Sequence, residues 1–193
     1  MAGHRQYTVL IDANVLYSVA MSDAMMEVSL TGIYAAKWSQ RIDEEWTTNL
    51  AANHSRPVSD FYTRRDLMHQ VCPDWEVPEK AWRMIESSIE LPDPKDKHVL
   101  AAAIAGHADS IVTCNLKDFP AEVLEPLGIT ALHPDEFLLQ QLELNPLTVL
   151  PAFKRMRARL KNPTFTPEYF VAALERNGLL QTAAFLRQAV QLI

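Results

Sequence analysis

The sequence has little of what defines several common protein classes. Its two cysteines, Cys72 and Cys114, lie far apart and fit neither a disulfide scaffold nor a metal-binding motif. With five glycines it has no phosphate-cradling loop, and no Walker or dinucleotide-binding motif occurs. No apolar run approaches the ~20 residues of a membrane helix, and the run before Asp12 is shorter than the ~7–15 residues of a secretory signal. These absences predict a soluble cytoplasmic protein that does not associate with membranes.

What the chain has is the composition of an ordinary globular protein with an uneven charge distribution. Of 193 residues, 48% are hydrophobic and 22% charged, and the net charge is −6. Residues 1–150 carry 22 acids and 11 bases, whereas residues 151–193 carry 2 acids and 7 bases. Such asymmetry often accompanies a division of function between two parts of a chain.

The order of hydrophobic patterns predicts an α/β fold. Compact apolar runs at 7–11, 110–113 and 129–132 are typical of buried strands, and helical patterns at 59–71, 79–90 and 93–106 lie between them. Strands separated by helices favour a parallel sheet with helices on its faces. After Pro134 only helical patterns occur. We therefore predict a domain at 1–144 and a basic helical extension at 145–193.

Polar residues follow two of the predicted strands. Asp12 ends the first strand, and Asn115 and Asp118 follow the second. Ligands of open parallel sheets bind beyond the carboxyl ends of the strands, so these side chains are expected at one edge. In the helix that starts at Asp93, Asp96 precedes the apolar positions and heads the buried stripe, while Asp93 is expected to cap the helix.

A further acid is expected from the helix that Ser39 caps. Its buried stripe recurs every four residues, beginning at Ile42. Glu44 points away from this stripe, whereas Asp43 and Glu45 flank it on its two sides, and helical geometry does not choose between them. Two carboxylates within about 4 Å repel by roughly 4 kcal/mol at an effective dielectric near 20, which a divalent cation relieves. Oxygen ligands favour Mg²⁺ or Mn²⁺, and such a site suits phosphodiester hydrolysis.

Four segments together resemble a known family. They are VLIDANVLYS, RIDEEWTTNL, LPDPKDKHVLAAAIAGHADSIVTCNLKDFP and HPDEFLL. Together they are similar to PIN-domain ribonucleases, most closely to the VapC-like group that has a helical C-terminal extension. The resemblance implies a PIN-like parallel β-sheet sandwiched between helices, and a metal-dependent endoribonuclease with four acids around Mg²⁺ or Mn²⁺.

Residue by residue, the resemblance implies that Asp12, Glu45, Asp96 and Asp118 are the catalytic and metal-binding acids. Asn14, Thr113 and Asn115 are expected as supporting polar residues. The sequence has no acid at position 115, which leaves open whether Asn115 or Asp118 completes the metal shell. Asp12 and Asp96 would bind the metal directly or through water, and the other acids would complete the shell or position the attacking water.

The resemblance also implies partners. Many VapC-like proteins are toxins of type II toxin–antitoxin pairs, so an RNA substrate such as tRNA, a cognate antitoxin and a homodimer are expected. Two other functions stay open: a housekeeping RNA-processing nuclease, and a catalytically silent module that binds RNA or protein. An intact set of mutually repelling acids argues against the silent module. A phosphatase of the haloacid-dehalogenase type is disfavoured because Asn14 stands where that enzyme needs a second aspartate.

The basic extension offers an RNA-contacting surface. Five bases occur within 154–161, and Lys154, Arg155, Arg157 and Arg159 are the candidate RNA-binding residues, with a solvated surface helix as the alternative. Two other predictions concern single residue types. His98 is expected at the surface or at a cap, because it lies two positions after Asp96. The four tryptophans are expected in the core rather than in base stacking.

Overall fold

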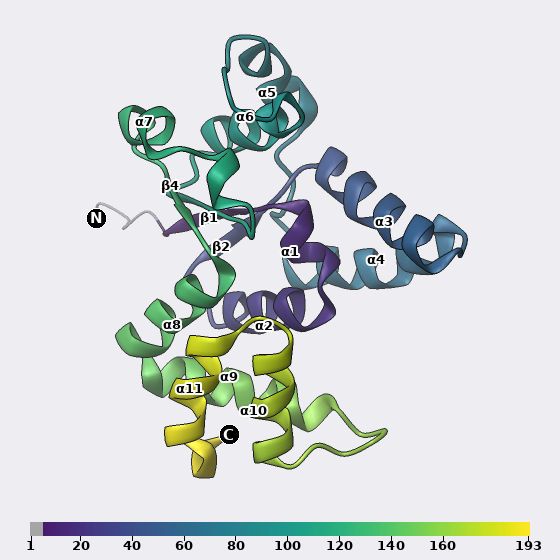
Figure 1. Ribbon diagram of the computed structural model, residues 1–193, viewed down its shortest axis with the longest axis vertical. Coiled ribbons are helices and arrows are strands. Elements are labelled where there is room, and N and C mark those ends of the chain that lie inside the picture. The colour runs from purple at the N-terminus through teal and green to yellow at the C-terminus, as the bar shows by residue number, and fades with distance from the viewer. Residues whose placement is uncertain (1–5) are drawn as a thin grey trace.

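The computed structural model describes residues 6–193 (Figure 1). Within them, four parallel strands form one sheet in the order β2-β1-β3-β4, so the predicted α/β fold with a parallel sheet is confirmed. The strands are β1 (Thr8–Ile11), β2 (Ala35–Lys37), β3 (Ser110–Val112) and β4 (Thr130–Leu132). β1 lies inside the sheet, where its continuous apolar run is buried on both faces.

Helices surround this sheet. Those of the first part are α1 (Ala13–Tyr17), α2 (Val19–Ser29), α3 (Gln40–His54), α4 (Tyr62–Val71), α5 (Glu79–Glu86), α6 (Lys97–Ala105) and α7 (Ala121–Leu124). Those of the second part are α8 (Pro134–Leu144), α9 (Pro146–Arg159), α10 (Pro167–Arg176) and α11 (Leu180–Gln188). Short 3₁₀ turns are η1 (Val58–Phe61), η2 (Pro94–Asp96), η3 (Leu116–Asp118), η4 (Glu125–Leu127) and η5 (Val190–Leu192).

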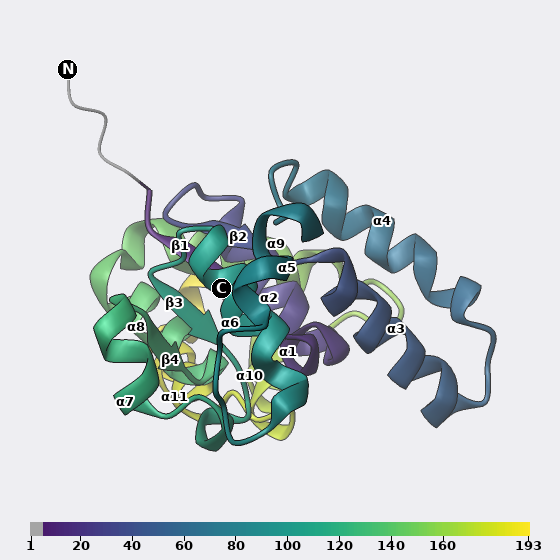
Figure 2. The same cartoon turned by 90° about the horizontal axis from the view of Figure 1, so that it is seen from above.

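Helices lie on both sides of the sheet, and α3 and α4 project at one end of the molecule (Figure 2). α6 and α7 contact the sheet from one side, and α2 contacts β2 and packs against α8 and α9 on the other (Figure 1). Figure 2 shows α3 and α4 side by side at one end of the molecule, away from α8 and α11. α3 is therefore the helix that reaches from the body of the domain toward solvent at the carboxyl end of β1.

Local sequence explains where the key helices begin. Ser39 accepts a hydrogen bond from the Ile42 amide at 3.3 Å and caps α3. Asp93 accepts one from the Lys95 amide at 2.9 Å, as predicted for the cap of the next helical segment. The segment differs from the prediction in one respect, because its first turn is the 3₁₀ helix η2 and α6 starts only at Lys97.

The C-terminal helices dock through buried polar contacts as well as apolar ones. Asp135, at the start of α8, is buried and accepts hydrogen bonds from the amides of Gln181 and Thr182 at 2.8 Å each. These amides lie in the first turn of α11, where backbone donors have no partner inside the helix. Asp135 therefore links α8 to the last helix. The predicted domain boundary at residue 145 stays a prediction.

Candidate active site

Asp12 stands where β1 ends and α1 begins. Its side chain is buried and caps α1, with Oδ1 accepting from the Ala13 amide at 2.6 Å. Oδ2 accepts from Thr113 Oγ1 at 2.8 Å and from Asn14 Nδ2 at 2.5 Å. Burial raises the pKa of Asp12, and the hydrogen bonds from Thr113 and Ala13 oppose the shift. The carboxylate is consequently held in one orientation at the edge of the sheet.

Asn14 and Thr113 join the ends of β1 and β3. Asn14 Nδ2 donates to Thr113 Oγ1 at 3.0 Å, and Asn14 Oδ1 accepts from the Cys114 amide at 2.9 Å. Thr113 Oγ1 also accepts from the Asn115 amide at 3.0 Å. Both residues contact the Asp12 carboxylate, at the edge of the sheet where the sequence predicts supporting polar groups.

Three carboxylates share one cleft at this edge. The cavity has a volume of about 310 Å³, and we call it the acid cleft. Asp12 from β1, Glu45 from α3 and Asp96 from η2 line it, and its remaining walls come from Ala13, Asn14, Tyr17, Asn49, Asn53 and Asn115. The strand edge, one helix and one 3₁₀ turn therefore bring together acids from three separate parts of the sequence.

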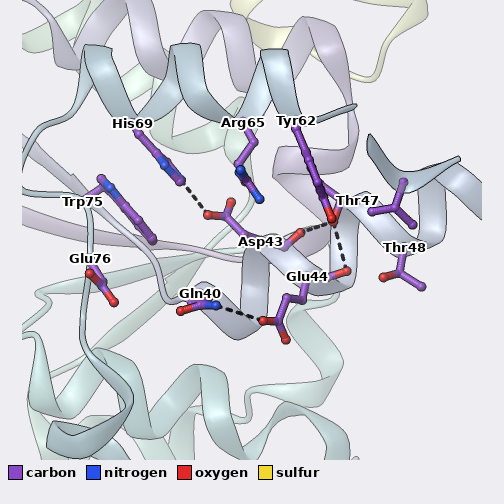
Figure 3. Close-up of a pocket in the computed structure, with 11 residues that line it drawn as sticks. Gln40, Asp43, Glu44, Thr47, Thr48, Tyr62, Arg65, His69, Trp75 and Glu76 are labelled. Atoms are coloured by element: carbon purple, nitrogen blue, oxygen red, sulfur yellow. Dashed lines mark hydrogen bonds and ion pairs between the residues drawn. The ribbon is translucent and has the colours of Figure 1, made fainter. Parts of the chain in front are cut away.

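Asp43 points away from the acid cleft. It is buried, and its Oδ1 accepts from Trp46 Nε1 at 2.9 Å while Oδ2 lies 2.7 Å from His69 Nε2 (Figure 3). Both carboxylate oxygens are occupied, one by a contact within α3 and the other by a contact with α4. Of the two acids that flank the buried stripe of α3, Glu45 is the one that faces Asp12.

The prediction for His98 is wrong. His98 is only 2% exposed, and its Nε2 lies 3.5 Å from Glu45 Oε2. Its Nδ1 is buried without a hydrogen-bond partner among the described residues. The Glu45 side chain, in contrast, is 43% exposed. Because His98 is buried, its imidazole is a fixed neighbour against which the Glu45 carboxylate can be oriented.

The electrostatics of the acid cleft are most evident at Asp96. Burial raises the pKa of Asp96 to about 6, and the shift is increased by the carboxylates of Asp12, Asp93, Asp118 and Glu45. Asp118 is thus close enough to act on Asp96, although the cavity itself is lined by Asn115. Of the two candidates for the fourth position, Asn115 lines the cavity and Asp118 does not.

Two protein families match different parts of this chain. The PIN domain family matches residues 8–117, which is more than half of the chain. The chain belongs to the PIN-domain family. A second family, the VapC50 C-terminal domain, matches residues 134–188, and this match starts with α8. The PIN domain of this chain therefore carries the C-terminal extension expected from the sequence.

One curated relative shares substantial sequence with this PIN-domain protein. It is named "Putative ribonuclease VapC50", from Mycobacterium tuberculosis, and it is 48% identical over 80 residues. The matched segment is 42% of this chain and 47% of the relative, so the chain spans about half the length of that protein. No solved structure matches.

The donor chemistry of the PIN-domain cleft fits a hard divalent cation. Carboxylates of Asp12, Glu45 and Asp96 with the Asn115 amide oxygen are the oxygen ligands that Mg²⁺ and Mn²⁺ prefer. Within residues 6–193, no three His, Cys, Asp or Glu side chains converge into a ready-made metal centre. The acids line one cleft. The raised pKa of Asp96 reflects burial first and then the neighbouring carboxylate charge, which a cation would neutralise.

Asp96 gives a prediction for stability. In the unfolded chain it loses its proton near pH 3.8, whereas in the fold it keeps the proton up to about pH 6, so its contribution to stability is lost as pH rises through that range. Asp96→Asn is therefore expected to raise Tm at pH 7.5 in chelator by roughly 2 °C, since solvent screens part of the repulsion. The gain should disappear near pH 4. Differential scanning calorimetry measures it, and a lower Tm at pH 7.5 would contradict the placement of Asp96 among acids.

The basic surface predicted on α9 is largely engaged within the protein. Arg155 Nε lies 2.8 Å from the buried Glu27 of α2, and Arg159 pairs with the same carboxylate. Arg157 donates to the Phe165 carbonyl at 2.9 Å. The two ion pairs with Glu27 hold α9 on α2. RNA binding by Lys154, Arg155, Arg157 and Arg159 stays a prediction.

The described helices include no membrane span. None within residues 6–193 combines the length and the apolar character that crossing a bilayer requires.

Proposed function

We propose that this PIN-domain protein is a Mg²⁺- or Mn²⁺-dependent endoribonuclease and the toxin of a type II toxin–antitoxin pair. The observation that supports the nuclease is the acid cleft, where Asp12, Glu45 and Asp96 meet at the carboxyl edge of the parallel sheet. Three carboxylates aimed at one solvent-open cavity are costly for a fold, which is expected where function requires them. The name of the relative, a ribonuclease at 48% identity, supports RNA as the substrate.

A bound Mg²⁺ or Mn²⁺ would activate a water molecule and stabilise the charge that develops on the scissile phosphate. Asp12, Asp96 and Glu45 would hold this cation, with Asn115 or Asp118 as the fourth group. Asp12 suits the task because Ala13, Thr113 and Asn14 fix its two oxygens. Asp12 would therefore be a preorganised ligand, and Asp96 and Glu45 would be more adaptable ones.

The half-exposed Glu45 is placed to act on the attacking water. Its carboxylate can accept a proton from that water as the new P–O bond forms and the bond to the leaving oxygen breaks. His98 lies against Oε2 and limits the orientations that the Glu45 carboxylate can take. The Asn115 side chain, which also lines the cleft, can orient the same water.

The toxin assignment rests on the relative and on the matched C-terminal region. A cognate antitoxin, an RNA target such as tRNA, a homodimer and a cytoplasmic location belong to this proposal. A housekeeping nuclease would share the acid cleft and differ in having no antitoxin. Growth arrest on induction, relieved by co-expression of a small neighbouring reading frame, would separate the two functions.

Cleavage of a mixed RNA panel that includes total tRNA tests the nuclease. With Mn²⁺ or Mg²⁺ we expect defined fragments, and with a chelator we expect none. Cleavage that continues unchanged in chelator would contradict the metal-dependent mechanism. The absence of cleavage from every RNA with either metal would favour the silent binding module instead.

A further inference from the structure

A second cavity lies on the other side of α3 from Glu45. It has a volume of about 590 Å³ and opens between α3 and α4 (Figure 3). We call it the aromatic pocket, and its lining includes Glu44, Tyr62, Arg65, His69, Trp75 and Glu76. Pockets of about 300–1,000 Å³ accommodate small organic groups, and a nucleobase is well within this range.

The polar groups at the floor of the aromatic pocket already have hydrogen-bond partners. Asp43 is buried there with both oxygens engaged by Trp46 and His69, and Thr47 Oγ1 donates to the Asp43 carbonyl at 2.7 Å. Asp43 therefore organises the pocket without offering a free charge to a ligand. The groups available to a ligand are those of the walls.

The walls present flat rings. The His69 ring stacks on Trp75 with centroids 4.0 Å apart and an interplanar angle of 8°, and Trp75 stacks on the buried Trp38 at 5.2 Å. Trp75 is only half-buried, unlike the other three tryptophans, so the core placement predicted for all four is incomplete. Along the same helix as His69, the Arg65 guanidinium lies 4.2 Å from the centroid of the Tyr62 ring. Preformed rings and a stacked guanidinium are the surfaces on which bases of single-stranded RNA stack.

A third hollow borders both the aromatic pocket and the acid cleft. This hollow of about 500 Å³ shares Glu44 and Thr48 with the pocket. It shares Glu45 and Asn49 with the cleft. The hollow also carries Lys95, His98 and Arg41, whose guanidinium pairs with Glu86 at 2.7 Å, so hydrogen-bonding groups of both charges lie between the two cavities. Because a helix with its side chains is about 10–12 Å across, a short single strand could cross α3 from one cavity to the other.

We propose that the aromatic pocket binds a nucleobase that flanks the scissile phosphate of the RNA substrate. This inference rests on the proposed function. The carboxylates of Glu44 and Glu76 disfavour a phosphate in the pocket and accept hydrogen bonds from exocyclic amino groups. The pocket is therefore selective for adenine, cytosine or guanine over uracil.

Binding of single-stranded RNA in chelator, where the proposed nuclease is inactive, tests the pocket. Fluorescence anisotropy with short labelled oligomers of adenosine, cytidine or uridine, at low ionic strength, gives the affinities of the full chain. The wild type should bind the adenosine and cytidine oligomers more tightly than the uridine oligomer. Tyr62→Ala should weaken their binding by about 5- to 150-fold, the range for loss of one stacked base. Glu44→Gln should reduce the preference over uridine.

Tyr169 provides a matched control. It is 50% exposed in α10 and has the guanidinium of Arg176 5.3 Å from its ring centroid, much as Tyr62 has Arg65, yet it lies in the C-terminal extension. Tyr169→Ala should leave RNA affinity unchanged. Tyr62 is 40% exposed, so neither substitution is expected to unfold the chain, which circular dichroism would verify.

Four results would each contradict the proposal that the aromatic pocket binds a nucleobase. They are equal affinities of wild type and Tyr62→Ala, an equal loss with Tyr169→Ala, no binding of any oligomer, or binding through Tyr62 of an arginine-rich peptide but not of RNA. Its failure is distinct from failure of the nuclease. Metal-dependent cleavage that is insensitive to Tyr62→Ala would contradict the nucleobase pocket and support the nuclease. RNA binding that depends on Tyr62, without any cleavage, would support the pocket and contradict the nuclease.

Discussion

Asp12→Asn is expected to lower RNA cleavage by about 100- to 1,000-fold at saturating Mn²⁺. That is the usual loss when one preorganised electrostatic group is removed from an active site. The substitution keeps the size of the side chain and an oxygen that can accept from the Ala13 amide, but it removes the charge that would bind the cation. The measurement is the initial rate of cleavage of an RNA that the wild type cuts, with protein of matched purity.

Glu143→Gln is the control for this loss. Glu143 is an exposed acid in α8 that does not line the acid cleft, so the variant loses one negative charge elsewhere and should cleave at the wild-type rate. Equal rates for wild type and Asp12→Asn would show that the activity does not come from this cleft. Equal losses in Asp12→Asn and Glu143→Gln would point to net charge rather than to a site.

Arg155→Met combined with Arg159→Met is expected to lower the free energy of unfolding by about 3–5 kcal/mol, the usual cost of leaving a buried charge without its partner. Glu27 is 3% exposed, and both guanidinium groups contact its carboxylate. Methionine retains the apolar stems that cover α2, so the loss measures the missing charge. Urea denaturation followed by circular dichroism gives the value.

Adding Glu27→Met to the two arginine substitutions should restore most of the lost stability, since an apolar triad of similar volume can replace a buried ionic one. The triple variant also separates structure from RNA binding. If its stability is restored while its RNA affinity stays low, the arginines contact RNA as the sequence predicted. Stability of the double variant equal to that of wild type would contradict the buried ion pairs themselves.

The sequence was most informative where a strand is buried on both faces. The apolar runs that became β1 and β3 are buried along their whole length, whereas the weaker run that became the edge strand β4 is partly exposed. Asp93 and Ser39 fix the starts of their helical segments by local hydrogen bonds. β2 escaped the sequence analysis because Ala35–Lys37 is short and contains no β-branched residue. Pairing with β1 makes it a strand, and such pairing has no local signature.

Helical periodicity could not determine which acid of α3 faces the acid cleft. Asp43 and Glu45 flank the buried stripe equally, and only the position of α3 between two cavities separates them. His98 was misplaced for a different reason. The count from Asp96 assumed one continuous α-helix, whereas Asp96 closes the 3₁₀ turn η2 and α6 starts after it, so the expected rotation between the two residues does not apply.

Binding of Mn²⁺ tests the central claim, that Asp12, Glu45 and Asp96 form one cation site, most directly. Electron paramagnetic resonance of free Mn²⁺ during titration gives the affinity without requiring an RNA substrate. Glu45→Gln should weaken binding by at least about 10-fold, while Glu143→Gln should match the wild type. Unchanged affinity in Glu45→Gln, or equal losses in both variants, would contradict a metal site in this cleft.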